Sequence, residues 1–152
     1  MFPIPILLIT FNRPNHTKRV LERVLEIKPE VLFVFQDGPR DDNALDVRKC
    51  SEVRGVIDRL VHECSPTTEV KKYYSARNLG CGAGPASGIT WFFDNVEKGI
   101  VMEDDCLAHV DFFGYCENLL NRYNENEGVM FINSTLYDDR WKIEESHSHK
   151  EV

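Results

Sequence analysis

Short apolar runs alternate with longer stretches of helical periodicity along most of this chain. The runs are rich in β-branched and aromatic residues, and they predict strands at 4–9, 31–35, 70–74, 100–102 and 129–132. Between the runs, apolar positions recur every three to four residues, the spacing of one buried helix face. We therefore expect an α/β fold, a three-layer α/β/α sandwich built around a mostly parallel sheet.

Four helices are expected between or after these strands. Asn15 is the expected N-cap of the first helix, and the second should fill residues 44–63. A glycine-rich loop at 80–84 precedes Pro85, a suitable first residue for a third helix that ends near residue 96. Apolar positions within 112–123 mark the fourth helix.

The composition narrows the class of protein. A chain of 152 residues with 42% hydrophobic and 28% charged residues is typical of one soluble globular domain. The net charge of −7 argues against nucleic acid or an anionic membrane as a partner, because both attract a basic face. We expect residues 1–139 to form the domain and residues 140–152, which lose all periodicity, to form an irregular tail.

Cysteine usage and the N-terminus bear on location. The five cysteines are an odd number and no two of them form a Cys-x-x-Cys pair, so a disulfide framework and a zinc ribbon are both disfavoured. The first apolar run is too short to span a bilayer, and no basic residues precede it, so no transmembrane segment is expected. These features favour a cytoplasmic protein, which could lie at the inner face of a bacterial membrane.

Conspicuous polar residues follow four of the predicted strands. Ligands of open α/β sheets gather outside the carboxyl ends of the strands, so the four loops should line one crevice. The residues concerned are Thr10, Phe11, Asn12 and Arg13 after the first strand, Gln36, Asp37 and Gly38 after the second, Arg77 and Asn78 after the third, and Glu103, Asp104 and Asp105 after the fourth.

The acidic triplet at 103–105 is the most informative of these groups. Three successive carboxylates after a buried strand repel one another, and a bound Mg²⁺ or Mn²⁺ would relieve that repulsion. Such ions take one or two protein carboxylates and complete their shell with substrate phosphates and water. The alternative is an exposed acidic turn that leads into a helix, whose N-terminus favours negative charge.

Arginines and glycines suggest how an anion could be held. Arg13 and Arg77 carry forked donors suited to a diphosphate or a nucleobase carbonyl, although for either one taken singly an ordinary surface arginine is the better interpretation. Gly80, Gly82 and Gly84 match neither the dinucleotide-binding spacing nor the P-loop spacing. These glycines indicate close backbone approach to a ligand or a neighbouring element, or simple loop flexibility.

The order of these elements resembles the nucleotide-diphospho-sugar glycosyltransferases of the GT-A fold. The similarity is closest to the bacterial family 2 type and more distant to N-acetylglucosaminyltransferase I. It covers residues 3 to about 137, nearly the whole chain. The segments that carry it are 5–14, 36–38, 77–80, 101–107 and 111–115.

The resemblance implies a metal-dependent transfer of a sugar from a nucleotide-diphosphate donor, UDP- or GDP-linked, to an unidentified acceptor. By the same resemblance, residues 10–13 and Asp37 would hold the nucleobase and ribose, and Asp104 would lie near the ribose. Further donor contacts would come from Arg77, Asn78 and Gly80.

The resemblance also implies Mn²⁺ or Mg²⁺ as cofactor. Asp105 would ligate the metal ion directly, and Glu103 would support it through water. The ion would stabilise the nucleoside diphosphate as it leaves, which is Lewis-acid catalysis.

The resemblance assigns no catalytic base. Transferases of this kind are normally longer, and their second half supplies the acceptor pocket and, in inverting members, the base. Asp138 and Asp139 follow the last predicted strand, but nothing marks them as that base. A non-catalytic or vestigial nucleotide-sugar binding module is therefore the alternative function. An exposed face could also support a homo-oligomer.

Overall fold

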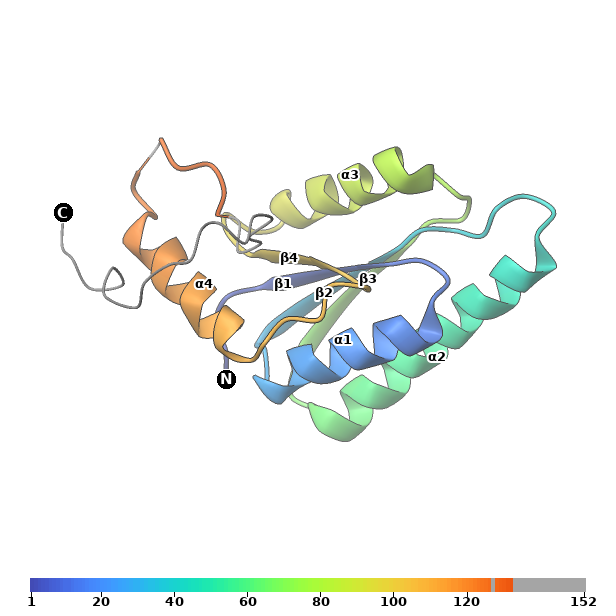
Figure 1. Cartoon of the computed structure of the whole chain (residues 1–152), viewed down its shortest axis with the longest axis horizontal. Helices are drawn as coiled ribbons and strands as arrows, with labels where there is room; N and C mark the ends of the chain where they lie inside the picture. Colours follow the sequence, from blue (N-terminus) through green and yellow to red (C-terminus); the bar gives the residue numbers. More distant parts are fainter. Residues whose placement is uncertain (127, 133–152) are drawn as a thin grey trace, which may run out of the picture.

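One parallel sheet forms the centre of the molecule. The computed structural model describes residues 1–126 and 128–132. Its strands are β1 (Ile6–Thr10), β2 (Val31–Gln36), β3 (Glu69–Tyr74) and β4 (Ile100–Glu103), arranged in the order β3-β2-β1-β4 (Figure 1). All three pairs of neighbouring strands are parallel.

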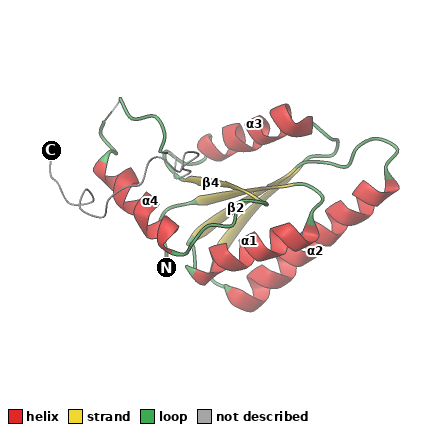
Figure 2. Ribbon diagram, viewed as in Figure 1, coloured by secondary structure: helices red, strands yellow, loops and turns green. Residues whose placement is uncertain are grey.

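Helices cover both faces of this sheet (Figure 2). The helices α1 (Pro14–Glu26) and α2 (Ala44–Cys64) lie on one face, and α3 (Gly80–Phe93) lies on the other. The helix α4 (Asp111–Arg122) packs beside the N-terminus, where Phe113 meets Phe2 edge to face with ring centroids 6.0 Å apart. The predicted α/β fold with a parallel sheet is confirmed, and the arrangement is compatible with a three-layer sandwich.

The central strand β1 shows why the apolar runs were continuous. Ile6 and Leu8 belong to the core cluster shared with α1, α2 and α4, while Leu7 and Ile9 belong to the cluster under α3. Because successive side chains of a strand point to opposite faces, a strand covered on both faces must be apolar at every position.

The predicted strand at 129–132 is wrong. These residues form no strand: the Val129 N–H donates to the Asn126 carbonyl oxygen at 3.0 Å, and Met130 and Phe131 are 90% and 76% exposed. An apolar run alone does not tell whether a sheet edge is available to pair with it. Among the described residues, β4 is consequently an edge of the sheet.

Two predicted helix starts are also wrong. The first residue of α1 is Pro14, and Arg13 rather than Asn15 occupies the N-cap position, without a side-chain cap bond. The helix α3 begins at Gly80, so Pro85 lies inside it and the glycine-rich segment forms its first turns. Gly80 has φ +82°, a backbone conformation that favours glycine.

The expectations about cysteines, membrane spans and the domain boundary can be compared with the described residues only in part. All five cysteines are free, and two of them, Cys50 and Cys116, are buried. No helix in the described part of the chain is both long and apolar enough to cross a membrane. The domain boundary expected at residue 139, the tail at 140–152, Asp138 and Asp139 all lie outside the described residues.

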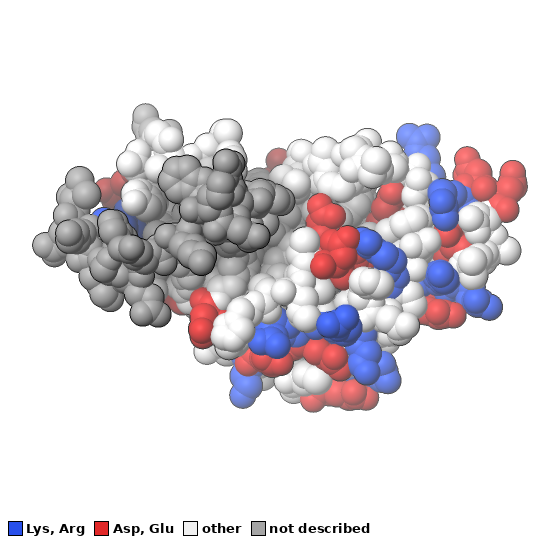
Figure 3. Space-filling model, viewed as in Figure 1, with Lys and Arg blue, Asp and Glu red and all other residues white. Residues whose placement is uncertain are grey.

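Basic and acidic side chains are interspersed on the face shown in Figure 3. Some of them pair one helical turn apart, as Lys18 does with Glu22 at 3.7 Å and Arg48 with Glu52 at 3.4 Å. Such exposed pairs contribute little to stability. The main effect of these charged side chains is to keep the outer faces of α1 and α2 hydrated.

The contact between α3 and the sheet provides a test of the packing. A Cβ added to Gly88 would lie 2.7 Å from the Cγ atom of Phe35. We expect Gly88→Ala to lower the free energy of unfolding by about 1–3 kcal/mol, the usual cost of overpacking a core. Urea denaturation measures this change.

Gly82→Ala is the matched control on the same helix. An added Cβ meets nothing within 4 Å at Gly82. Replacing this helical glycine should raise stability by roughly 0.5–1 kcal/mol. A Gly88→Ala protein as stable as wild type would contradict the close approach of α3 to β2.

Candidate functional site

A cavity of about 320 Å³ lies at the carboxyl ends of β1, β2 and β4, beside the start of α3. Small-molecule sites commonly have volumes of ~300–1,000 Å³. Of the eleven residues that the sequence assigned to donor or metal, eight line this crevice: Thr10, Phe11, Arg13, Asp37, Asn78, Gly80, Glu103 and Asp104.

Strand pairing brings these residues together. In the parallel ladder Thr10 lies opposite Gln36, and Ile9 lies opposite Glu103. The pairing continues one step past the strands, because the Asp37 N–H donates to the Thr10 carbonyl and the Asp104 N–H to the Ile9 carbonyl, each at 3.0 Å. The two aspartates are therefore fixed by the main chain on either side of β1.

Asp104 is a buried carboxylate, with 1% of its surface exposed. Its Oδ1 atom forms an ion pair with the Arg13 guanidinium, and its Oδ2 atom accepts from the Phe11 N–H and the Thr17 hydroxyl, both at 3.4 Å. Burial raises the pKa of Asp104 above its usual value, and the opposing effect of Arg13 does not cancel this rise. A buried acid of this kind in a cleft is a candidate functional group.

Asp105 shares the same arginine but is 43% exposed. Its Oδ2 atom accepts from Arg13 Nη1 at 2.8 Å. Partial burial alone would raise the pKa of Asp105, but the hydrogen bond and charge of Arg13 outweigh it, so the pKa lies below its usual value. Arg13 thus bridges Asp104 and Asp105 and offsets much of the repulsion within the triplet. The alternative interpretation of the triplet as an exposed acidic turn therefore applies to Asp105, which is exposed, but not to Asp104, which is buried.

The acidic residues suit a metal ion only if a ligand completes its shell. Within residues 1–126 and 128–132, no three His, Cys, Asp or Glu side chains are grouped so that they could hold a metal ion. Asp105 and Glu103 nevertheless offer exposed carboxylate oxygens, the donors that Mg²⁺ and Mn²⁺ prefer. These residues fit an ion that arrives with phosphate ligands rather than one held in a closed protein cage.

Asp37 has a role that the sequence did not indicate. Its Oδ1 atom accepts from the N–H groups of Gly38 and Leu79 at 2.9 and 2.8 Å. Its Oδ2 atom accepts from Asn78 Nδ2 at 3.0 Å and from the Gly80 N–H at 3.1 Å. The carboxylate therefore caps the N-terminus of α3, which satisfies free N–H groups and places negative charge where the helix dipole favours it.

Three predicted residues do not line the crevice. Asn12 turns to the buried carboxylate of Asp46, with its Nδ2 atom 2.7 Å from Oδ1. Arg77 is exposed, and its backbone lies so close to Gly38 that a Cβ there would be 2.6 Å from the Arg77 carbonyl. The third, Asp105, is linked to the crevice through Arg13.

Sequence analysis missed Arg40 and Asp46. Arg40 lines the crevice, and its Nε and Nη2 atoms donate to the two Asp46 oxygens at 2.5 and 3.0 Å. The hydrogen bonds from Arg40 lower the pKa of Asp46 to about 2. A signal was present, because Asp46 falls on the buried stripe of α2 with Cys50 and Val53, where a charged residue requires a partner.

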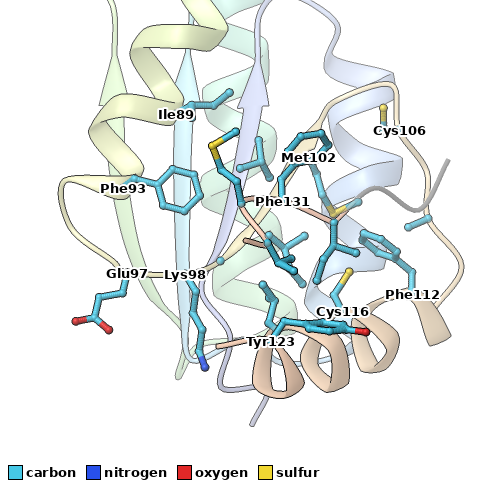
Figure 4. A pocket seen from close by; sticks show the side chains of 18 of the residues that line it. Ile89, Phe93, Glu97, Lys98, Met102, Cys106, Phe112, Cys116, Tyr123 and Phe131 are labelled. Atoms are coloured by element: carbon cyan, nitrogen blue, oxygen red, sulfur yellow. The ribbon is translucent and has the colours of Figure 1, made fainter. Parts of the chain in front are cut away.

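A larger groove of about 1,050 Å³ lies between β4, α3 and α4 (Figure 4). Its lining is mainly apolar and includes Phe93, Met102, Phe112 and Cys116, with Glu97 and Lys98 toward one end. Binding sites combine apolar walls with a few convergent polar groups. The smaller crevice, which gathers several charged and amide side chains, fits that description better.

No model of a known protein family matches this chain, and no solved structure gives a significant match. The resemblance noted in the sequence motifs stays a hypothesis, and the crevice is the structural basis for a proposed function.

The lowered pKa of Asp46 predicts an acid-dependent loss of stability. The pKa falls on folding from 3.8 to about 2, so the stabilisation is present above pH 3.8 and is lost as the pH falls toward 2. Asp46→Asn should be less stable than wild type at pH 6, and the difference should shrink by pH 2–3. Urea midpoints at both pH values measure it, and a pH-independent difference would contradict it.

The effect of Asp104 on the pH dependence of stability should be opposite to that of Asp46. The pKa of Asp104 is raised on folding, so its ionisation costs stability as the pH rises through the folded pKa. We expect Asp104→Asn to be more stable than wild type at pH 7, and the two proteins to converge below the ordinary aspartate pKa. The same denaturation series tests this expectation. A less stable Asp104→Asn protein at pH 7 would mean that pairing with Arg13 exceeds the cost of burial.

Proposed function

We propose that this chain binds a nucleotide-diphosphate sugar in the crevice, as the donor-binding part of a metal-dependent glycosyltransferase. One observation carries the proposal: eight residues from four loops, singled out by their sequence context, line one cavity at the carboxyl ends of parallel strands. That position is where open α/β sheets bind their ligands.

The β4 side of the crevice suits the diphosphate. Asp105 and Glu103 would hold Mn²⁺ or Mg²⁺ together with the phosphates, and the ion, when bound, would stabilise the departing nucleoside diphosphate. Arg13 stands on the crevice wall with 41% of its side chain exposed, so a phosphate could engage the guanidinium that now pairs with Asp104 and Asp105.

The side near β2 and α3 suits the nucleoside. Phe11 offers an aromatic surface there, and Asn78 lies just before the start of α3. The Asn78 amide group donates to the Gly38 carbonyl at 2.9 Å as well as to Asp37. Both of its N–H donors are engaged in this way, so its carbonyl oxygen is the atom that can accept from a ligand.

The pairing of Arg13 with two carboxylates favours a second candidate function. Asp104 and Asp105 are both satisfied by an arginine of the same chain. A binding module without catalysis, in which the acidic loop no longer holds a metal ion, therefore fits the same geometry. Transfer of labelled sugar to a broad acceptor mixture would distinguish the two functions.

Calorimetric titration with UDP and GDP, with and without Mn²⁺, tests the proposal. We expect binding that Mn²⁺ strengthens and that Asp105→Ala weakens by at least about tenfold, since even indirect changes around a metal ion cost about 10–100-fold. Asp94→Ala removes an exposed carboxylate at the far end of α3 and should leave binding unchanged.

Two outcomes would contradict the proposal in different ways. If neither nucleotide binds at millimolar concentration, with or without Mn²⁺, the crevice is not a nucleotide site. If a nucleotide binds equally well without Mn²⁺ and to Asp105→Ala, the metal role is wrong and the binding module is favoured.

A further inference from the structure

The two ends of the crevice carry different charged side chains because of the strand order. The acidic triplet follows β4, Arg40 lies in the loop after β2, and β1 lies between them. A ligand that spans the crevice therefore meets the acidic triplet with Arg13 at one end and the guanidinium of Arg40 at the other.

Arg40 is held in place by a buried partner. Asp46 has 1% of its surface exposed and accepts from the Nε, Nη2 and backbone N–H groups of Arg40. The guanidinium carbon also lies 5.9 Å from the ring centroid of Phe11, within the range of a cation–π contact. A guanidinium fixed in this way loses little conformational entropy when it binds a ligand.

The fixed guanidinium still has donors to offer. Arginine has five N–H donors, and Asp46 takes two of them from the side chain, which leaves 5 − 2 = 3. Within the described part of the chain, no hydrogen bond uses these three. Arg40 therefore presents donors, and no acceptor, to whatever occupies its end of the crevice.

We propose that Arg40, positioned by Asp46, is the residue that selects the base of the nucleotide. Uracil O4 and guanine O6 are carbonyl oxygens that accept from a guanidinium. Cytosine and adenine carry amino groups at the corresponding positions 4 and 6, and an amino group there cannot accept. The inference rests on the proposed function, because it assumes a nucleoside diphosphate in this crevice. It adds a specificity-determining residue and a positioning residue that the sequence motifs did not include.

The strand order favours the base over the phosphates as the partner of Arg40. If Asp105 and a cation hold the diphosphate on the β4 side, the other end of the ligand extends across β1 toward β2. That end is the base. Arg13 contacts Asp105, so it is the arginine that would contact the phosphates.

Dissociation constants for UDP, GDP, ADP, CDP and inorganic pyrophosphate, all with Mn²⁺, test the proposal. We expect wild type to bind UDP or GDP about 10–100-fold more tightly than ADP, the worth of a hydrogen bond to a charged group. Arg40→Gln should remove most of this ratio and leave pyrophosphate binding unchanged. Arg48→Gln, at an exposed arginine of α2, is the matched control and should retain the ratio.

Asp46→Asn tests the positioning role. Arg40 remains in this variant but loses its charged anchor, so the UDP-to-ADP ratio should fall even where the fold is intact. A purely structural role for Asp46 would change stability and leave the ratio unchanged. If Arg40→Gln fails to fold because Asp46 is left unpaired, the double variant Arg40→Gln, Asp46→Asn removes the buried charge and gives the same readout.

The possible results separate this inference from the proposed function. If Arg40→Gln weakens pyrophosphate and every nucleotide equally, Arg40 is a phosphate contact and base selection by it is overturned. If UDP or GDP binds and the ratio survives in Arg40→Gln, the inference fails while the proposed function stands. If wild type binds no nucleotide, both fail.

Discussion

Main-chain hydrogen bonds on both sides of β1 determine where the loops after β1, β2 and β4 begin, and the rest of the crevice is built on these loops. The hydrogen bonds align the carboxyl ends of β2, β1 and β4, and they continue one residue further to Asp37 and Asp104. Segments about 30 and 90 residues away from Thr10 along the chain thereby reach one edge of the sheet. This alignment depends on backbone pairing, so it tolerates changes in most loop side chains but not a shift in strand register.

On the side of the crevice next to β4, the arrangement of the side chains depends on how the buried negative charge of Asp104 is balanced. A buried carboxylate is unfavourable unless it is paired, and Arg13 supplies the pairing for Asp104 while also reaching Asp105. The raised pKa of Asp104 shows that this pairing does not fully offset burial. Locally unfavourable groups in an otherwise well-packed domain often mark functional sites, and Asp104 is therefore a candidate functional residue.

The elements that were predicted well are those whose own residues form a clear hydrophobic pattern. The strands β1 and β2 are continuous apolar runs, and α2 follows a clear three-to-four periodicity, so their positions were predicted to within about two residues. Most of the crevice was predicted too, because parallel strands must end at a shared edge.

Two of the errors share a physical cause, which is that the deciding contact lies outside the local sequence. The start of α3 was misplaced because its cap, Asp37, is 43 residues from Gly80. The run at 129–132 has strand-like residues, but the described structure gives it no strand partner. Arg40 is a different case, because its partner Asp46 is only six residues away. The buried stripe of α2 indicates that Asp46 needs a partner, but the polar turn before it does not show which residue supplies it.

The cap on α3 makes one wall of the crevice stiff. Each oxygen of Asp37 already accepts two hydrogen bonds, so the loops after β2 and β3 and the first turn of α3 are joined through a single carboxylate. Displacing any of them would break bonds to the others. The opposite wall carries Arg13, which is 41% exposed and is held by side-chain contacts to Asp104 and Asp105. A ligand that needs room in the crevice will therefore reshape the β4 wall and leave the α3 wall as a fixed template.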